Sequence, residues 1–255
     1  MKGLVLAGGT GSRLYPLTKV INKHLLPVGR YPMIYYPIGA LVAAGIRDVM
    51  IVTGGNNAGM FLELLGNGSV FGLGHLHYAY QERAGGIADA LKAAEDFVDG
   101  DRCVVVLGDN IIGGSIKDSV DGFREQERGA RILLKEVSNP AEYGVAQLGA
   151  DFRVIRIIEK PKQHVSNYAV IGVYMYDEAL WHILPGLRHS ARGELEITDV
   201  NNAYLERGVL TADVLECDWG DAGGSHESLL EAGVIANRCR PLESFDLGGL
   251  EEAPA

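Results

Sequence analysis

The chain has 255 residues, of which 47% are hydrophobic and 22% charged, and these proportions exclude an intrinsically disordered or fibrous protein. A net charge of −10 argues against general nucleic-acid binding, and no apolar run reaches the roughly 18 residues of a membrane-spanning helix. The three cysteines have no metal-binding spacing, and the first apolar run is too short for a signal peptide. We therefore expect a cytoplasmic protein that binds neither nucleic acid nor a membrane.

The first 129 residues alternate between short apolar runs and segments with helical patterning. The short runs predict buried strands at residues 2–7, 49–53, 76–80 and 103–107. The segments between them predict helices at residues 32–44, 57–65, 87–98 and 116–128. This alternation predicts a Rossmann-like α/β fold, in which a mostly parallel sheet is covered by helices on both faces.

The pattern changes after residue 130. Close-set apolar runs predict antiparallel strands, added to the same sheet, at residues 130–137, 145–148, 154–158 and 169–176. Further elements are predicted as helices at about 177–187 and 196–207, a strand at 209–216 and a last helix at 225–237. We expect a single domain over residues 1–238, made of the halves 1–129 and 130–238, and a loosely ordered tail at 239–255.

A glycine-rich segment follows the first strand, and ligands of such sheets bind beyond the carboxyl ends of the strands. The segment LAGGTGSRL, residues 6–14, is neither a Walker A loop nor a GxGxxG motif. Its glycines expose backbone N–H groups that can bind an anion, and Arg13 and Lys23 follow closely. Three bare amides and two cations suit a triphosphate better than a lone carboxylate. The first 47 residues hold six basic residues and no acid, which favours a local polyanion site or is a chance clustering. A tight turn that is glycine-rich for packing alone remains open.

Carboxylates follow two other predicted strands. Asp109 ends the run VVVLGD, and Asp221 lies among glycines in CDWGDAGG. Two such carboxylates, together with phosphate oxygens and waters, suit Mg²⁺. Taken singly, each is equally typical of a turn or helix-capping acid. Glu159 and Lys160 also end a predicted strand; they suit a sugar hydroxyl and a phosphate, or alternatively form a surface ion pair.

Together these motifs resemble the sugar-phosphate nucleotidylyltransferases, and within them the glucose-1-phosphate thymidylyltransferases. The resemblance covers residues 1–237. It is carried by LAGGTGSRLYPLTKVINKHLLPVGRYPMIYYPI and then, in the order of the family, by GDN, EYGV, EKP, RGELEITDVN and WGDAGGSHESLLEA. The segment ERAGGIAD at 82–89 departs from the proline-containing base-binding loop of the family. The choice between thymine and uracil therefore stays open.

The resemblance implies an enzyme that transfers a nucleotidyl group, dTMP from dTTP, to glucose 1-phosphate, forming dTDP-glucose and pyrophosphate by direct in-line attack. It further implies Mg²⁺ as cofactor, a nucleotide-binding half at 1–129, a sugar-phosphate-binding half at 130–238, and a homo-oligomer, either dimer or tetramer. Two alternatives stay open: a uridylyltransferase that uses UTP on the same fold, and a non-catalytic regulatory protein that binds a nucleotide sugar. A Rossmann dehydrogenase is disfavoured because GxGxxG is absent.

Roles for individual residues also follow from the resemblance. Arg13 is expected to bind the leaving pyrophosphate, Lys23 to neutralise charge at the α-phosphate, and Lys160 to orient the attacking sugar phosphate. The metal ligands are expected to be Asp109 and Asp221. The nucleotide is expected to contact Leu6, Ala7, Gly8, Gly9, Gly11, Gln81, Gly86 and Asp109. The sugar phosphate is expected to contact Asn110, Tyr143, Gly144, Glu159, Lys160, Val170 and Tyr174.

The recognisable sequence ends near Asn237. Longer thymidylyltransferases carry further C-terminal helices, which help to form a second nucleotide-sugar site between subunits. We therefore expect product inhibition by competition with the nucleotide alone. Apolar helix faces, such as that of the helix predicted at 32–44, are candidate subunit contacts.

Overall fold

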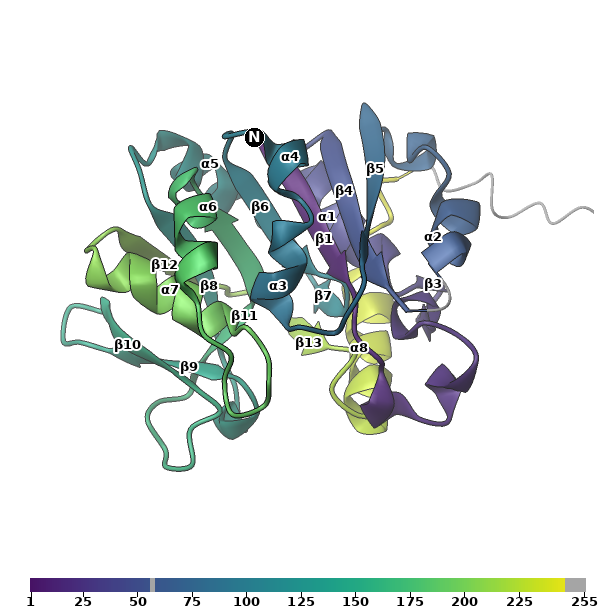
Figure 1. The fold of residues 1–255 in the computed structure, drawn as a ribbon. Coiled ribbons are helices and arrows are strands. Elements are labelled where there is room, and N and C mark those ends of the chain that lie inside the picture. The colour runs from purple at the N-terminus through teal and green to yellow at the C-terminus, as the bar shows by residue number, and fades with distance from the viewer. Residues whose placement is uncertain (56–57, 246–255) are drawn as a thin grey trace, which may run out of the picture.

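The computed structural model describes residues 1–55 and 58–245. Its main feature is a nine-stranded sheet (Figure 1). One part is parallel, in the order β6-β1-β4-β5, as predicted for the first half of the chain. These strands are β1 (Lys2–Ala7), β4 (Asp48–Gly54), β5 (His75–Gln81) and β6 (Cys103–Leu107).

The second half of the chain extends this sheet through one long strand, β11 (Tyr168–Tyr176). One edge of β11 pairs with β8, and the other pairs with β9 at Ala169–Val170 and with β6 at Val173–Tyr176. All of these pairings are antiparallel, as predicted. The remaining strands are β8 (Ala130–Glu136), β9 (Gly144–Leu148), β10 (Val154–Glu159) and β12 (Leu210–Val214). Both halves therefore share one continuous sheet.

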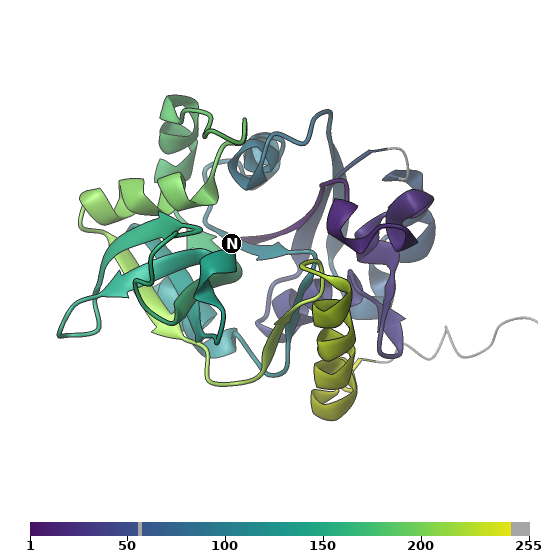
Figure 2. The ribbon, with the colours of Figure 1, turned by 90° about the horizontal axis from the view of Figure 1, so that it is seen from below.

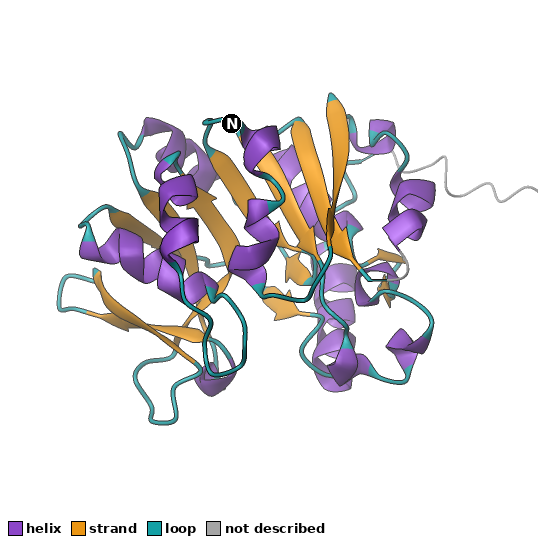
Figure 3. Ribbon diagram, in the orientation of Figure 1, coloured by secondary structure: helices purple, strands orange, loops and turns teal. Residues whose placement is uncertain are grey.

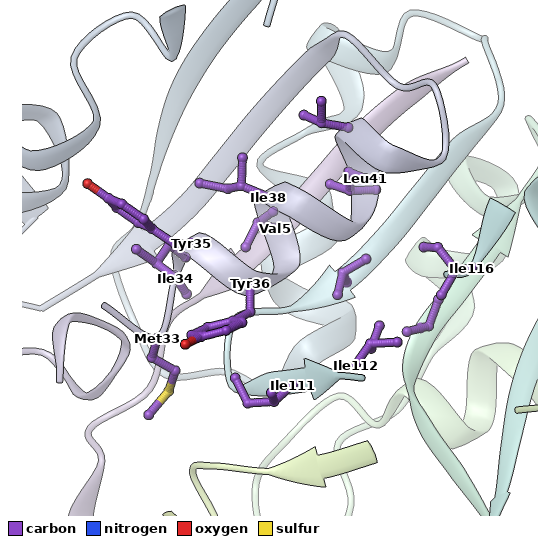
Figure 4. Close-up of a cluster of buried hydrophobic side chains, with 14 of the residues drawn as sticks. Val5, Met33, Ile34, Tyr35, Tyr36, Ile38, Leu41, Ile111, Ile112 and Ile116 are labelled. Atoms are coloured by element: carbon purple, nitrogen blue, oxygen red, sulfur yellow. The ribbon is translucent and has the colours of Figure 1, made fainter. Parts of the chain in front are cut away.

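Helices cover both faces of the sheet (Figure 3). One face packs on α1 (Tyr35–Ala43), α2 (Ala58–Leu65), α5 (Lys117–Glu125) and α8 (His226–Cys239). The other packs on α3 (Ile87–Lys92), α4 (Glu95–Val98), α6 (Ala179–Ile183) and α7 (Ile197–Glu206). Since side chains alternate along a strand, Val5 of β1 enters the first core and Leu4 the second. Figure 4 shows the first core, where side chains of α1 gather with Val5 and with Ile111 and Ile112.

Three short elements after β1 and two short strand pairs were not predicted. The 3-10 helices Ser12–Leu14, Leu17–Lys19 and Lys23–Leu25 follow the glycine-rich segment. A hairpin joins β2 (Pro27–Val28) to β3 (Tyr31–Pro32), and a ribbon joins β7 (Asn110–Ile112) to β13 (Trp219–Asp221). Further 3-10 turns lie at Ser69–Phe71, Pro140–Glu142 and Leu184–Gly186.

Several predicted boundaries need correction. The helix predicted from residue 32 begins at Tyr35, because Pro32 pairs in the β2–β3 hairpin. The helix predicted at 87–98 divides into α3 and α4, since Ala94 leaves the helical conformation at φ −107° and ψ 0°. For the helix predicted at 57–65, Asn57 lies outside the described residues.

The predicted tail and the predicted role of helix α1 also need correction. Residues 239–245, predicted as part of a loose tail, include the last residue of α8 and a turn whose Leu242 is 2% exposed and packs on Gly39 of α1. The rest of the predicted tail lies outside the described residues. Helix α1 is internal, with Tyr35, Ile38 and Leu41 fully buried, so its apolar face is core rather than a subunit contact. No helix within residues 1–55 and 58–245 is long and apolar enough to cross a membrane.

Candidate active site

A cleft of about 380 Å³ opens at the edge of the sheet where β1, β5 and β6 end. Viewed from this edge in Figure 2, β9, β10 and α7 lie on one side and the 3-10 helices that follow β1 lie on the other. Residues from both halves of the chain line the cleft. The glycine-rich segment and Gln81 come from the first half, and Glu159, Lys160 and Tyr174 come from the second.

The cleft brings together the residues that the sequence predicted for a site, with one exception. The predicted residues on its walls are Leu6, Gly8, Gly9, Gly11, Arg13, Lys23, Gln81, Gly86, Asp109, Asn110, Tyr143, Gly144, Glu159, Lys160, Val170, Tyr174 and Asp221. Ala7 is the exception: it is fully buried beneath the segment, and its carbonyl accepts a hydrogen bond from Asn22 Nδ2 at 3.4 Å. Ala7 therefore shapes the segment from below instead of facing a ligand.

The glycine-rich segment depends on backbone conformations that favour glycine. Gly9 and Gly11 have φ values of +95° and +63°. The Gly11 carbonyl accepts a hydrogen bond from Thr18 Oγ1 at 2.8 Å, which ties the segment to the following 3-10 helix. A Cβ on Gly8 would lie only 2.8 Å from Gln81 Oε1. The segment can therefore approach a ligand and the end of β5 more closely than side chains would allow.

Two cations on opposite walls have no partner within residues 1–55 and 58–245. Arg13, on the first 3-10 helix, and Lys160, directly after β10, both line the cleft. Neither has an ion-pair or hydrogen-bond partner for its charged group among the residues that the structure describes. Lys160 adopts a φ of +42°, and its N–H donates to the Tyr143 carbonyl at 3.0 Å. Two unpaired cations in one cleft suit a ligand with two separate negative groups.

A third cation lies deeper and is paired. Lys23 Nζ lies 2.5 Å from Asp109 Oδ2. Burial alone would lower the pKa of Lys23, but the charge of Asp109 and their hydrogen bond raise it. Burial would likewise raise the pKa of Asp109, yet Lys23 outweighs it and lowers that pKa to about 2. Both groups are therefore ionised at neutral pH.

Asp221 reaches the same place through the β7–β13 ribbon. It lies opposite Asn110, the neighbour of Asp109, and Gly223 N–H donates to its Oδ1 at 3.0 Å. Burial and the charge of Asp109 raise the pKa of Asp221 to about 6. A Cβ on Gly223 would collide with Asp109 Oδ2 and would lie 2.7 Å from Lys23 Nζ, so this glycine lets the three groups converge.

Asn110 connects the two halves of the chain at the base of the cleft through its hydrogen bonds. Its Oδ1 accepts hydrogen bonds from Gly172 N–H at 3.0 Å and from Trp219 Nε1 at 2.7 Å, and its Nδ2 donates to Asp109 Oδ1 at 3.1 Å. Gly172 lies where β11 passes from β9 to β6. Asn110 thus connects the Asp109 carboxylate to β11 and β13 instead of pointing freely into the cleft.

The second half supplies a polar wall. Glu159 Oε1 accepts a hydrogen bond from Arg192 Nη2 at 3.0 Å, and its Oε2 accepts one from Thr198 Oγ1 at 2.7 Å. Burial, and secondarily the charge of Asp221, raises the pKa of Tyr143 to about 12, so its hydroxyl stays protonated. Its ring meets the Trp219 ring edge-on at 5.5 Å. Such a wall of acceptors and aromatic rings suits sugar hydroxyls.

Sequence reasoning did not assign roles to three residues on this wall. Arg192, Thr198 and Trp219 line the cleft and orient residues that were predicted. Arg192 and Thr198 belong to RGELEITDVN, which was noted as a motif. Neither residue follows a strand, because Arg192 precedes α7 and Thr198 lies in its first turn, so the position of strand ends does not predict their roles.

Carboxylates on the cleft walls are the candidate metal ligands. Within residues 1–55 and 58–245, no three His, Cys, Asp or Glu side chains gather as a metal site. Asp109 and Asp221 converge at the buried end of the cleft, and a cation bound between their carboxylates would need further oxygens from a ligand or water.

Comparisons with known proteins agree over nearly the whole chain. A family described as "Nucleotidyl transferase" matches residues 2–237. A glucose-1-phosphate thymidylyltransferase of Neisseria meningitidis is 42% identical over 255 residues, covering 99% of this chain and 88% of the relative. One of Mycobacterium tuberculosis is 44% identical over 235 residues, covering 91% and 81%.

Solved structures agree with these relatives. A Bacillus anthracis protein, described as a candidate glucose-1-phosphate thymidylyltransferase in complex with sucrose, has a TM-score of 0.88 and 52% identity. The match covers 92% of this chain and 95% of that one. A UDP-glucose pyrophosphorylase complexed with UDP-glucose has a TM-score of 0.83 at 24% identity, which shows a shared fold. On this evidence the chain belongs to the nucleotidyl transferase family.

Proposed function

We propose that the protein is a glucose-1-phosphate thymidylyltransferase, which transfers dTMP from dTTP to glucose 1-phosphate and releases pyrophosphate. One observation carries the proposal: a single cleft holds two cations that have no partner in the described part of the chain, Arg13 beside the glycine-rich segment and Lys160 beside the Glu159 wall. The reaction needs two anionic substrates side by side, and each cation can hold one of them. Relatives of this name align over nearly the whole chain.

The arrangement supports catalysis through positioning and charge. Backbone N–H groups of the glycine-rich segment and Arg13 bind the triphosphate, and Arg13 retains the leaving pyrophosphate. Lys160 orients the sugar phosphate so that its oxygen attacks the α-phosphorus in line. Lys23, held by Asp109, neutralises the charge that develops there. The P–O bond to pyrophosphate breaks as the new bond forms, so no covalent intermediate on the protein is needed.

We also propose Mg²⁺ as cofactor, held by Asp109 and Asp221. The residues fit the ion because both ligands are carboxylates that converge at Gly223. The raised pKa of Asp221 has the same cause, two buried carboxylates in proximity, and a bound cation relieves this repulsion. When bound, the ion neutralises phosphate charge.

We further propose a cytoplasmic homo-oligomer, a dimer or tetramer. Its candidate contact is α8, where Leu230 is 73% and Val234 57% exposed one helical turn apart. The three cysteines are free, which is typical of a reducing compartment.

A matrix of substrates tests the proposed function. Pyrophosphate release is measured with dTTP, UTP, dCTP and ATP against glucose 1-phosphate and other sugar 1-phosphates. Highest kcat/KM with dTTP and glucose 1-phosphate is expected. Preference for UTP would make the protein a uridylyltransferase, and no release with any pair would contradict the proposal.

A further inference from the structure

The two sides of the cleft leave one place for the nucleobase. Glu159 ends β10 at one end of the strand order and Lys160 follows it directly. The glycine-rich segment follows β1 in the interior of the sheet, and Gln81 ends β5 at the other end. A nucleotide whose phosphates lie at the glycine-rich segment, with the sugar phosphate beside Lys160, must extend its base toward β5. Gln81 lines this end of the cleft together with Gly8 and Gly86.

The Gln81 amide has a fixed orientation. Its Nε2 donates to Asp89 Oδ2 at 3.0 Å and more weakly to the Gly86 carbonyl at 3.4 Å. A carboxylate and a carbonyl accept hydrogen bonds and donate none, so the opposite orientation would set three acceptor groups against each other. The orientation therefore follows from chemistry, and Oε1 lies on the side of Gly8, at the cleft.

Asp89 is itself held in place. It lies in the first turn of α3, and its Oδ1 is 3.6 Å from Lys92 Nζ one turn later. A Cβ on Gly85 would lie 2.5 Å from Asp89 Oδ2, so the bare backbone at this glycine gives the carboxylate its room. Asp89 and Gly85 both belong to ERAGGIAD, the segment whose departure from the family left the choice of base open.

We propose that Asp89 determines base specificity by locking Gln81 so that the cleft presents a hydrogen-bond acceptor, Oε1, to the base. The ligand class is a nucleotide whose base carries a ring N–H donor, as the imide N3–H of thymine or uracil does. Cytosine presents an acceptor at N3 and is excluded, because two acceptors would be desolvated without a partner. The inference rests on the proposed function and names a positioning residue for it.

The main test is Asp89→Asn. An asparagine can donate through its Nδ2, so Gln81 can rotate and present its NH₂ to the base, which matches cytosine N3. The ratio of kcat/KM for dTTP to that for dCTP is expected to fall at least ~10-fold. Asp89→Ala, which removes the acceptor, is expected to narrow the ratio as well. The control is Asp96→Asn, an exposed acid in the first turn of α4, which is expected to leave the ratio unchanged.

A double variant separates positioning from a general structural effect. In a Gln81→Leu background there is no amide to orient. The double variant is therefore expected to have the same ratio of kcat/KM for dTTP to that for dCTP as Gln81→Leu alone. An Asp89→Asn protein as selective as wild type, or an equal effect with and without Gln81, would overturn the inference. Calorimetric binding of dTTP and dCTP without sugar phosphate reads the same selectivity independently of turnover. If the wild-type protein released no pyrophosphate, the proposed function would be refuted. Selective binding of dTTP over dCTP by the same protein would still support the role of Asp89.

Discussion

Two carboxylates and one ammonium group share the buried end of the cleft. Lys23 pairs with Asp109, and burial together with the charge of Asp109 raises the pKa of Asp221 beside them. The arrangement brings together the two carboxylates that the proposed Mg²⁺ site needs. Each of these side chains is thus expected to matter to turnover, and Lys23 and Asp109 also to folding, because a buried charge left without its partner is costly.

Removing either carboxylate tests the proposed metal site. Asp109→Asn and Asp221→Asn are each expected to lower the rate of pyrophosphate release by about 10²-fold or more, since a metal anchor contributes several kcal/mol to the transition state. The rate is measured while Mg²⁺ is titrated. Asp218→Asn is the matched control: it lies on the same segment but pairs with Arg238 at the surface, and near-normal turnover is expected. Unchanged turnover in both cleft variants would rule out the assigned role.

The two unpaired cations are expected to serve different substrates. Arg13→Ala should reduce use of the nucleotide and the rate of chemistry together, whereas Lys160→Ala should mainly raise the KM for the sugar phosphate. Each substrate is titrated at saturation of the other. If both variants changed both substrates equally, the assignment of one cation to each pocket would be wrong.

At the scale of elements, the β7–β13 ribbon and the turn after it set the geometry of the site. Gly223→Ala places a methyl group against Asp109 and Lys23 and is expected to lower kcat/KM at least ~10-fold, because small displacements of charged groups are costly to catalysis. Gly59→Ala is the control, since its added Cβ in α2 meets no atom within 4 Å. That control should keep full activity and gain up to ~1 kcal/mol of stability. Full activity of Gly223→Ala would show that the pair tolerates displacement.

Strands built from one apolar run were predictable, and short pairings were not. β1 and β6 have the predicted bounds, because each contains four or five consecutive apolar residues, which leave little choice of register. β7 and β13 have three residues each and form only because segments about 110 residues apart meet. No local sequence pattern predicts a pairing between segments so far apart.

The difference between local patterns and long-range contacts also explains which site residues could be predicted. Asp109, Lys160 and Asp221 end or follow strands, so the rule that ligands bind at carboxyl ends located them. Arg192 lies in the segment before α7, and its hydrogen bond to Glu159 at the end of β10 depends on how these two elements pack together. Roles that arise from such contacts require the structure.

At the scale of the whole molecule, a buried histidine links stability to pH. His24 is 1% exposed, and burial together with the charge of Lys23 lowers its pKa from 6.5 to about 3. The unfolded chain therefore binds a proton between these values that the folded chain does not. The stability contributed by neutral His24 is fully present above pH 6.5 and is lost as the pH falls toward 3.

Urea denaturation at pH 7 and pH 5 measures this linkage. The loss is about 1.4 kcal/mol per pH unit below 6.5, or about 2 kcal/mol at pH 5. In His24→Asn the decrease in unfolding free energy between the two pH values is expected to be smaller by that amount, although the variant is less stable at both. An equal decrease in the two proteins would contradict the low pKa.

The position of β11 has a consequence for how the chain folds during synthesis. β6 ends at Leu107, but its neighbour on the outer edge begins about 60 residues later, at Tyr168. Until that strand leaves the ribosome, the parallel strands of the first half have an open edge of unpaired N–H and C=O groups, which can pair with another nascent chain. The strand that closes this edge also carries Val170 and Tyr174, the floor of the sugar side of the cleft. The addition of β11 to the sheet therefore both protects the nascent chain from aggregation and completes the second substrate pocket.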